Sequence, residues 1–95
     1  MTTLAKPERI VDQRFLAHVR SLRCLVCSHP SPDAHHLQSR GAGGSDYTCV
    51  PLCRAHHQEY HAIGLTRFET KHHRINLWRE NSRIVVGYFT REEAA

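Results

Sequence analysis

The sequence predicts a small α+β domain in which two short strands and a helix carry a cluster of metal ligands. Three observations lead to this prediction. The chain has 95 residues, which is one domain with a small core, and such a core often needs a staple. Cysteine and histidine gather in short stretches, above all in the segment 51–61, PLCRAHHQEYH. Helical patterns lie towards both ends of the chain, with two short β-like runs between them.

The first predicted helix lies within 8–23, because Val11, Phe15 and Val19 recur at i, i+4 and i+8. A metal-bearing core is expected over 24–63, and a helical extension over 64–95. The chain shows no internal repeat and no long linker, so 1–95 is predicted to be a single domain.

Two short strands are expected inside the core. The run AHHL (34–37) is short enough for a strand end, and YTCVPL (47–52) has β-branched and aromatic residues. Pro51 confines the second run to an edge or a strand terminus. The run between them, with three glycines, reads as a loop.

Three helical segments are expected after the strands. The first covers 53–63 and ends at Gly64, and the second opens at Thr66 in a T-x-x-E capping box and runs to about 73. Asn76 is the next N-cap candidate. Trp78 is expected to be buried and to anchor the last helix in the core. The run RIVVGYF (83–89) fits a helix or a strand equally well. The helical stripe comprises Leu77, Ile84, Val85 and Tyr88.

Four ligands have the spacing of a closed structural zinc site. Cys24-x2-Cys27 lets two sulfurs reach one tetrahedral ion, and Cys53-x2-His56 is a second half-site of the same span. The segment 1–15 lacks the apolar stretch of a secretion signal, which predicts a reducing, cytoplasmic location and favours metal over disulfides. The alternatives are unrelated buried thiols or a disulfide-braced secreted domain. Cys49 is expected to be a small buried thiol.

The remaining motif histidines predict a second ion. His57 and His61 are i and i+4 on the predicted helix and therefore share one face. Adjacent residues of a strand point to opposite faces, so either His35 or His36 can complete a three-histidine site while the other points elsewhere. Three protein ligands with open positions are typical of a catalytic metal site.

The stretch AHHLQSRGAGGSDYTCVPLCRAHHQEYH, residues 34–61, resembles the core of the HNH, or ββα-metal (His-Me finger), endonuclease superfamily. In that family two short strands and a helix clamp one divalent ion against DNA. The likeness is greatest to compact, zinc-stapled phage and prophage members, which include a RecA-dependent nuclease. It covers about residues 24–61, and the preceding helix extends it to Val11.

The resemblance implies a role for each motif position. His36 matches the general base, and the family's bracing asparagine is replaced by Thr48, so that Thr48 or Asp46 must brace the loop. The divalent-metal ligands implied are His35, His57 and His61, and the zinc ligands are Cys24, Cys27, Cys53 and His56.

The function implied is a metal-dependent DNA endonuclease of phage or prophage origin with little sequence specificity. It would use one structural zinc and one catalytic Mg, Mn, Ni or Zn ion. Three imidazoles suit the borderline metals better than Mg. Double-stranded DNA is the expected partner, with RecA filaments or terminase and portal proteins as further partners. The rival interpretation is a non-catalytic zinc-finger module that binds nucleic acid.

The charge of the chain is compatible with a nucleic-acid partner. The net charge is +4, and 11 of the 13 basic residues are arginine, which binds phosphate with a planar fork. Arg40 and Arg54 are the candidates for phosphate contacts. No run approaches the ~18 apolar residues of a membrane span, so no membrane partner is expected.

Overall fold

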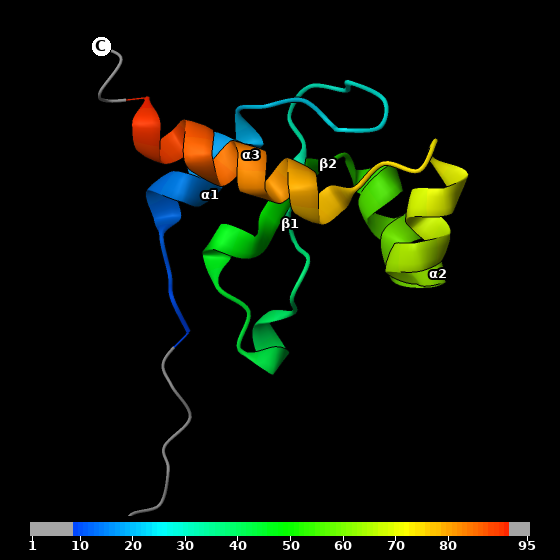
Figure 1. Ribbon diagram of the computed structural model, residues 1–95, viewed down its shortest axis with the longest axis horizontal. Helices are drawn as coiled ribbons and strands as arrows, with labels where there is room; N and C mark the ends of the chain where they lie inside the picture. Colours follow the sequence, from blue (N-terminus) through cyan, green and yellow to red (C-terminus); the bar gives the residue numbers. More distant parts are fainter. Residues whose placement is uncertain (1–8, 92–95) are drawn as a thin grey trace, which may run out of the picture.

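The computed structural model describes residues 9–91, and this part of the chain has the predicted α+β class. Figure 1 shows a two-stranded hairpin with the helices arranged around it. The elements are α1 (Gln13–Arg20), β1 (Asp33–His36), the 3-10 turns η1 (Arg40–Ala42) and η2 (Asp46–Thr48), β2 (Cys49–Leu52), α2 (Arg54–Lys71) and α3 (Leu77–Thr90).

The hairpin register fixes which side chains share a face. β1 and β2 are antiparallel, with His35 opposite Val50 and His36 opposite Cys49. Directly paired residues point to the same side of a sheet, and successive residues alternate. His35 therefore lies on the side of Val50, and His36 on the side of Cys49.

β2 is buried on both faces and separates two apolar clusters. The strand was predicted to begin at residue 47, but Tyr47 and Thr48 form the preceding turn η2. The cluster towards α2 contains Cys24, Val50, Leu52, Cys53, Phe68 and Leu77. The cluster towards α1 contains Phe15, Leu16, Val19, Cys49 and Tyr88.

Helix α1 is shorter than predicted. Asp12 caps it by accepting a hydrogen bond from the Phe15 N–H, so the helix begins at Gln13, and the predicted start at residue 8 lies outside the described residues. Phe15 and Val19 are buried as expected, but Val11 is 53 % exposed because it precedes the cap.

Helix α2 bends at Gly64, where the sequence predicted its end. The backbone there has φ 82° and ψ 169°, a region open essentially to glycine, and the chain then resumes helical geometry to Lys71. The capping box predicted at Thr66 does not form. Glu69 instead accepts a hydrogen bond from the Leu77 N–H at 2.7 Å and so ties α2 to the start of α3.

The last apolar run is the helix α3, and the strand alternative is excluded. Asn76 caps it as predicted, accepting from the Arg79 N–H, and Leu77 and Tyr88 are buried. Trp78 is not a core anchor, because it is 41 % exposed. It lies one residue, or about 100°, away from the inward-facing Leu77.

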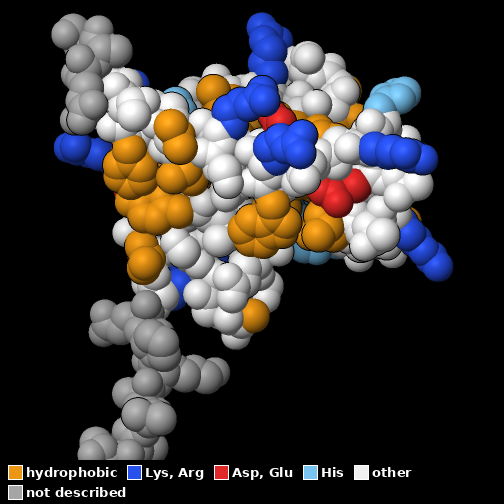
Figure 2. Space-filling view, viewed as in Figure 1, with side chains coloured by type: hydrophobic (Ala, Val, Ile, Leu, Met, Phe, Trp, Pro, Cys, Tyr) orange, Lys and Arg blue, Asp and Glu red, His pale blue; other side chains and the backbone are white. Residues whose placement is uncertain are grey.

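Several apolar side chains remain on the surface of the described residues. Figure 2 shows hydrophobic side chains gathered over the end of the molecule where α1 and α3 meet. Within residues 9–91, no helix combines the length and the apolar character needed to cross a membrane. The exposed apolar residues are Ile10, Val11, Trp78, Val86 and Phe89.

Candidate metal centres

The first candidate centre is a Cys3His cluster beneath α2. The segment 24–27 lies next to the start of α2, and the donor atoms of Cys24, Cys27, Cys53 and His56 all lie within 4.8 Å of one another. Cys24 and Cys53 are buried, so the centre is part of the apolar cluster on the α2 side of β2. All four cysteines are free thiols in this structure.

The spacings in this cluster fit a tetrahedral ion. Two thiolates on one zinc-sized ion lie about 3.8 Å apart, and a thiolate and an imidazole nitrogen about 3.6 Å apart. The Cys27 and Cys53 sulfurs are 3.8 Å apart, and the Cys24 sulfur is 3.5 Å from His56 Nδ1. Burial opposes ionisation of Cys24, but hydrogen bonds from backbone N–H groups and the His56 ring outweigh it and lower the thiol pKa to about 6.

Glu59 and His72 lie beside the zinc-type ligand His56. His72 pairs with Glu59 and packs its ring against Phe68. His56 directs Nδ1 at the sulfurs, 3.2 Å from Cys53. The His56 ring also packs edge-on against the rings of His72 and Phe68.

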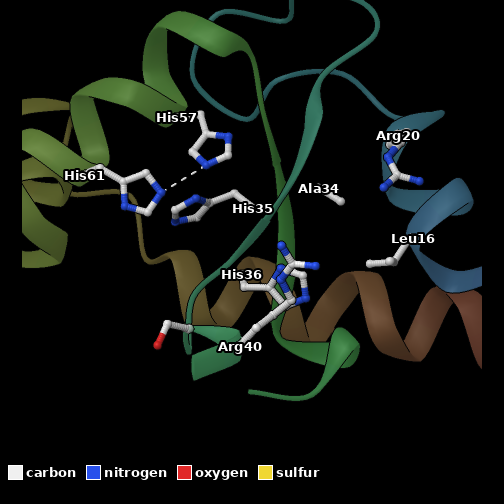
Figure 3. Close-up of a pocket in the computed structure, with 9 residues that line it drawn as sticks. Leu16, Arg20, Ala34, His35, His36, Arg40, His57 and His61 are labelled. Carbon is white, nitrogen blue, oxygen red and sulfur yellow. Dashed lines mark hydrogen bonds between the residues drawn. The ribbon is translucent and has the colours of Figure 1, made fainter. Parts of the chain in front are cut away.

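The second candidate centre comprises the three histidines His35, His57 and His61. The Nε2 atoms of His57 and His61 are 3.0 Å apart, as expected for helix positions i and i+4. Two imidazoles on one ion would place their nitrogens about 2.8 to 3.4 Å apart. Figure 3 shows the three rings converging from β1 and α2.

His35 has the strongest signature of a missing ligand partner. Its side chain is 1 % exposed, and both ring nitrogens are buried without a hydrogen-bond partner. Burial, reinforced by His57 and His61, lowers the pKa of His35 to about 3, so the ring is neutral at physiological pH. A neutral buried imidazole with orphan nitrogens fits a metal ligand, because an unpaired buried polar group is otherwise costly.

Asp33 orients the His57 ring, and the sequence analysis missed it. Asp33 Oδ2 lies 2.9 Å from His57 Nδ1, which leaves His57 Nε2 facing His61. Metal-binding histidines commonly bond a carboxylate through the other ring nitrogen in this way. The available signal was the spacing, since Asp33 precedes His35 by two residues and so shares its face of β1.

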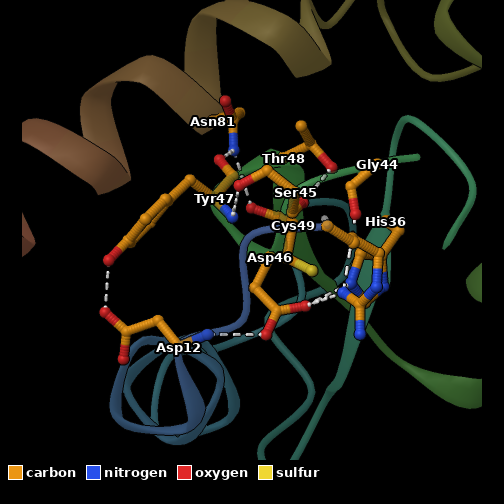
Figure 4. A network of polar contacts seen from close by, with 10 residues as sticks. Asp12, His36, Gly44, Ser45, Asp46, Tyr47, Thr48, Cys49 and Asn81 are labelled. Carbon is orange, nitrogen blue, oxygen red and sulfur yellow. Dashed lines mark hydrogen bonds and ion pairs between the residues drawn. The ribbon is translucent and has the colours of Figure 1, made fainter. Parts of the chain in front are cut away.

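His36 lies on the opposite face of β1, paired with a buried carboxylate. Its Nε2 is 2.9 Å from Asp46 Oδ1, and Asp46 also accepts a hydrogen bond from the Asp12 N–H (Figure 4). Arg9 donates a further hydrogen bond to Asp46. Burial raises the pKa of Asp46, but the hydrogen bonds from His36, Asp12 and Arg9 outweigh it and lower the pKa below its ordinary value. An ionised Asp46 accepts only, so His36 Nε2 donates, and in the neutral form of the ring the lone pair is on Nδ1.

The turn that carries Asp46 is braced from two sides. Thr48 donates from its hydroxyl to the Ser45 carbonyl, and its own carbonyl accepts from the Leu37 N–H beside His36. Asn81 on α3, which is 6 % exposed, donates to the carbonyls of Tyr47 and Cys49 at 2.6 and 3.0 Å (Figure 4). Sequence reasoning missed Asn81 because it lies 34 residues from Tyr47 in the turn that it holds.

The three-histidine cluster and His36 line one cleft of about 340 Å³. Of the two arginines predicted to bind phosphate, Arg40 lines this cleft. Arg54 is ion-paired to Asp33 at 3.0 Å instead. Arg20 at the end of α1 also lines the cleft and was not predicted. The full lining comprises Leu16, Arg20, Ala34, His35, His36, Ser39, Arg40, His57 and His61.

Comparison with known proteins gives the chain a family but not an activity. It is 36 % identical over 74 residues to the "Uncharacterized protein YdfU" of Escherichia coli (strain K12), over 73 % of this chain and 21 % of the relative. The chain thus spans about a fifth of the length of that curated relative. No solved structure matches the chain. A family model described as "Protein of unknown function (DUF968)" matches residues 2–84, and the chain therefore belongs to the DUF968 family.

Proposed function

We propose that this domain is a metal-dependent DNA endonuclease of the HNH, or ββα-metal, type. One observation carries the proposal. His35, a buried ring with two unpartnered nitrogens, converges with His57 and His61, and the adjacent His36 is bonded to a buried carboxylate in the same cleft. A purely structural domain has no need for both groups to share one opening.

The Cys3His cluster is proposed to hold a structural zinc. Four protein ligands leave no open position for a substrate, which is the form of a structural site. Three soft thiolates favour zinc over the hard cations Mg and Ca. The cluster joins the segment 24–27 to the first turn of α2, so a bound zinc would fix α2 against the hairpin.

The three-histidine cluster is proposed to hold the catalytic divalent ion. When bound, the ion would stabilise charge on the phosphate and on the departing 3′ oxygen as a Lewis acid. His35, His57 and His61 supply one donor atom each, and Asp33 holds His57 in the orientation that directs Nε2 inward. Imidazole donors suit Mn, Ni or Zn better than Mg.

His36 is proposed to be the general base. Its Nε2 donates to the ionised Asp46, so the lone pair on Nδ1 is available to take a proton from the attacking water. The imidazolium that results is stabilised by the same carboxylate. Histidine is the natural base at neutral pH, and such a group typically contributes about 10²- to 10⁴-fold in rate.

The order of the elements supports the assignment to this fold. β1, β2 and α2 follow one another along the chain. β1 carries His35 and His36, Cys53 lies between β2 and α2, and α2 carries His57 and His61. The bracing expected of the family's asparagine comes here from Thr48, Asp46 and Asn81. Backbone-directed contacts through arginine carry no base information, which agrees with little sequence specificity.

The test is cleavage of supercoiled plasmid by purified protein in Mg, Mn, Ni, Co or Zn, with EDTA as the control. Conversion to nicked or linear plasmid with at least one metal, abolished by EDTA and by His36→Ala, is the expected result. Tight binding to DNA with no cleavage under any metal would instead favour the zinc-finger binding module.

A further inference from the structure

The cleft that contains the histidines is electropositive at its rim. Nine residues line it, all within 9–91, and none of them is acidic. Two are arginines, Arg20 from the last turn of α1 and Arg40 from η1, and both side chains are exposed.

The nearby carboxylates do not neutralise these two arginines. Asp33 is occupied by Arg54 and His57, and Asp46 by Arg9, His36 and the Asp12 N–H. Among the described residues, the guanidinium groups of Arg20 and Arg40 make no hydrogen bond or ion pair. Arg9 and Arg54 are thus used within the protein, while Arg20 and Arg40 keep all their donors for a ligand.

Arg20 also lies apart from the metal-type ligands. Figure 3 shows it on α1, across the cleft from His57 and His61, with His36 between the two sides. A phosphate held at the three histidines and attacked near His36 would leave Arg20 facing the next part of the substrate.

We infer that Arg20 is a positioning residue that binds the phosphate next to the scissile one, with Arg40 assisting on the same rim. This inference rests on the proposed function and restricts the range of substrates. The cleft takes a strand with consecutive phosphates, and a small phosphodiester that has one phosphate leaves Arg20 without a partner. The planar fork of arginine matches two phosphate oxygens, which a lysine ammonium does not.

The first test measures DNA binding by zinc-loaded protein with no second metal added, so it does not depend on catalysis. Affinity for a duplex oligonucleotide is followed by fluorescence anisotropy over a series of salt concentrations. Arg20→Ala should weaken binding about 10-fold or more, and should make the log–log salt slope shallower by about 0.9, the value for one phosphate contact. Arg20→Lys should keep the slope and recover part of the affinity.

Arg14→Ala is the matched control, because Arg14 lies on the same helix but in a different hollow, with Ala17, His18, Ser21 and Arg91. It should alter neither affinity nor slope. An Arg20→Ala slope equal to that of wild type would overturn the inference, whatever the plasmid assay shows.

The second test compares two substrates for each variant. Arg20→Ala should lose at least ~10-fold more kcat/KM on plasmid DNA than on bis(p-nitrophenyl) phosphate, which has no neighbouring phosphate. Equal losses on both substrates would also overturn the inference. A wild-type protein that cleaves neither substrate would overturn the nuclease proposal, and the slope measurement would then decide the role of Arg20 in binding alone.

Discussion

Asp33 Oδ2 lies 2.9 Å from His57 Nδ1, and this contact turns the other nitrogen of His57 towards His61. The carboxylate comes from β1 and the imidazole from α2, so the contact also fixes the helix against the strand. The orientation of His57, a candidate metal ligand, therefore depends on Asp33, which is not one of the three candidate ligands.

Asp33→Ala should weaken binding of Mn or Ni at the second centre by about 10- to 100-fold, because the His57 ring loses the partner that sets its tautomer and angle. Isothermal titration of zinc-loaded protein measures this. Arg54→Ala is the control, since it removes the other partner of Asp33 and leaves the His57 contact in place. Equal losses in both variants would mean that the surface ion pair, and not the His57 contact, matters.

Cys24→Ser and Cys53→Ser should each lose the tightly held zinc and unfold much of the domain. Binding free energy at a structural zinc, about 10 to 16 kcal/mol in small peptides, is as large as the whole stability of most domains. Thermal unfolding by circular dichroism, together with metal analysis, checks both losses.

Cys49→Ser is the comparison for these variants. Cys49 is fully buried, but it lies in the other apolar cluster and not at the metal centre. It should keep its zinc and lose about 1 to 3 kcal/mol, because a hydroxyl replaces a buried thiol. A cooperative thermal transition of zinc-free Cys24→Ser at a temperature near that of wild type would contradict the structural role of the zinc.

His36→Ala and His57→Ala should both stop plasmid cleavage, for different reasons. His36→Ala should lower the cleavage rate by about 10²-fold or more while the second metal binds as in wild type, because His36 moves a proton. His57→Ala should bind Mn or Ni much more weakly, since two imidazoles replace three. Calorimetric titration of both variants separates the two losses.

The same experiment tests which histidine of β1 is the metal ligand and which is the general base. If His36→Ala loses the metal and His35→Ala keeps it, the assigned roles must be exchanged.

The stabilisation provided by Asp46 should be lost in acid. The pKa of Asp46 in the folded protein is lowered below its ordinary value, so its contribution is complete above about pH 4 and disappears as the pH falls through the folded-state pKa. Asp46→Asn should therefore be less stable than wild type by about 1 to 3 kcal/mol at pH 7, and the difference should shrink below pH ~4.

Urea denaturation of both proteins at several pH values, with equal zinc, measures the difference and cancels effects common to both. A difference that is constant from neutral to acid pH would show that the charge of Asp46 is not what stabilises the turn.

Asn81→Ala should destabilise the fold through the turn at 47–49. It leaves the carbonyls of Tyr47 and Cys49 without their side-chain donor, at about 1 to 3 kcal/mol each, which corresponds to a fall in Tm of about 4 to 8 °C per kcal/mol. Ser82→Ala, at an exposed position on the same helix, is the control. Equal Tm values for the two variants would contradict the bracing role.

Most of the secondary structure followed from local signals. The periodicity of Phe15 and Val19, the cap at Asn76 and the break at Gly64 each depend on residues within a turn or two of one another. One error came where a group of the next helix competed for a cap. Glu69 was expected to cap its own helix but caps the start of α3 instead.

The exposed Trp78 is an error of a different kind. Its size favours burial on average, but the direction of a helical side chain is set by where the neighbouring element lies. The buried positions Leu77 and Asn81 decide the inward face of α3, and Trp78 lies beside it.

The sequence by itself determined the local ligand pairs, because their spacings are short: C-x2-C, C-x2-H and H-x3-H each bring donors together within a single turn. Only the tertiary structure decided how they combine. The register that pairs His35 with Val50 and His36 with Cys49 places one ring towards α2 and the other towards Asp46. Packing then brought Asp33, Asn81 and Arg20 to the site, because their partners are distant in sequence and are chosen by the burial of β2 between two apolar clusters.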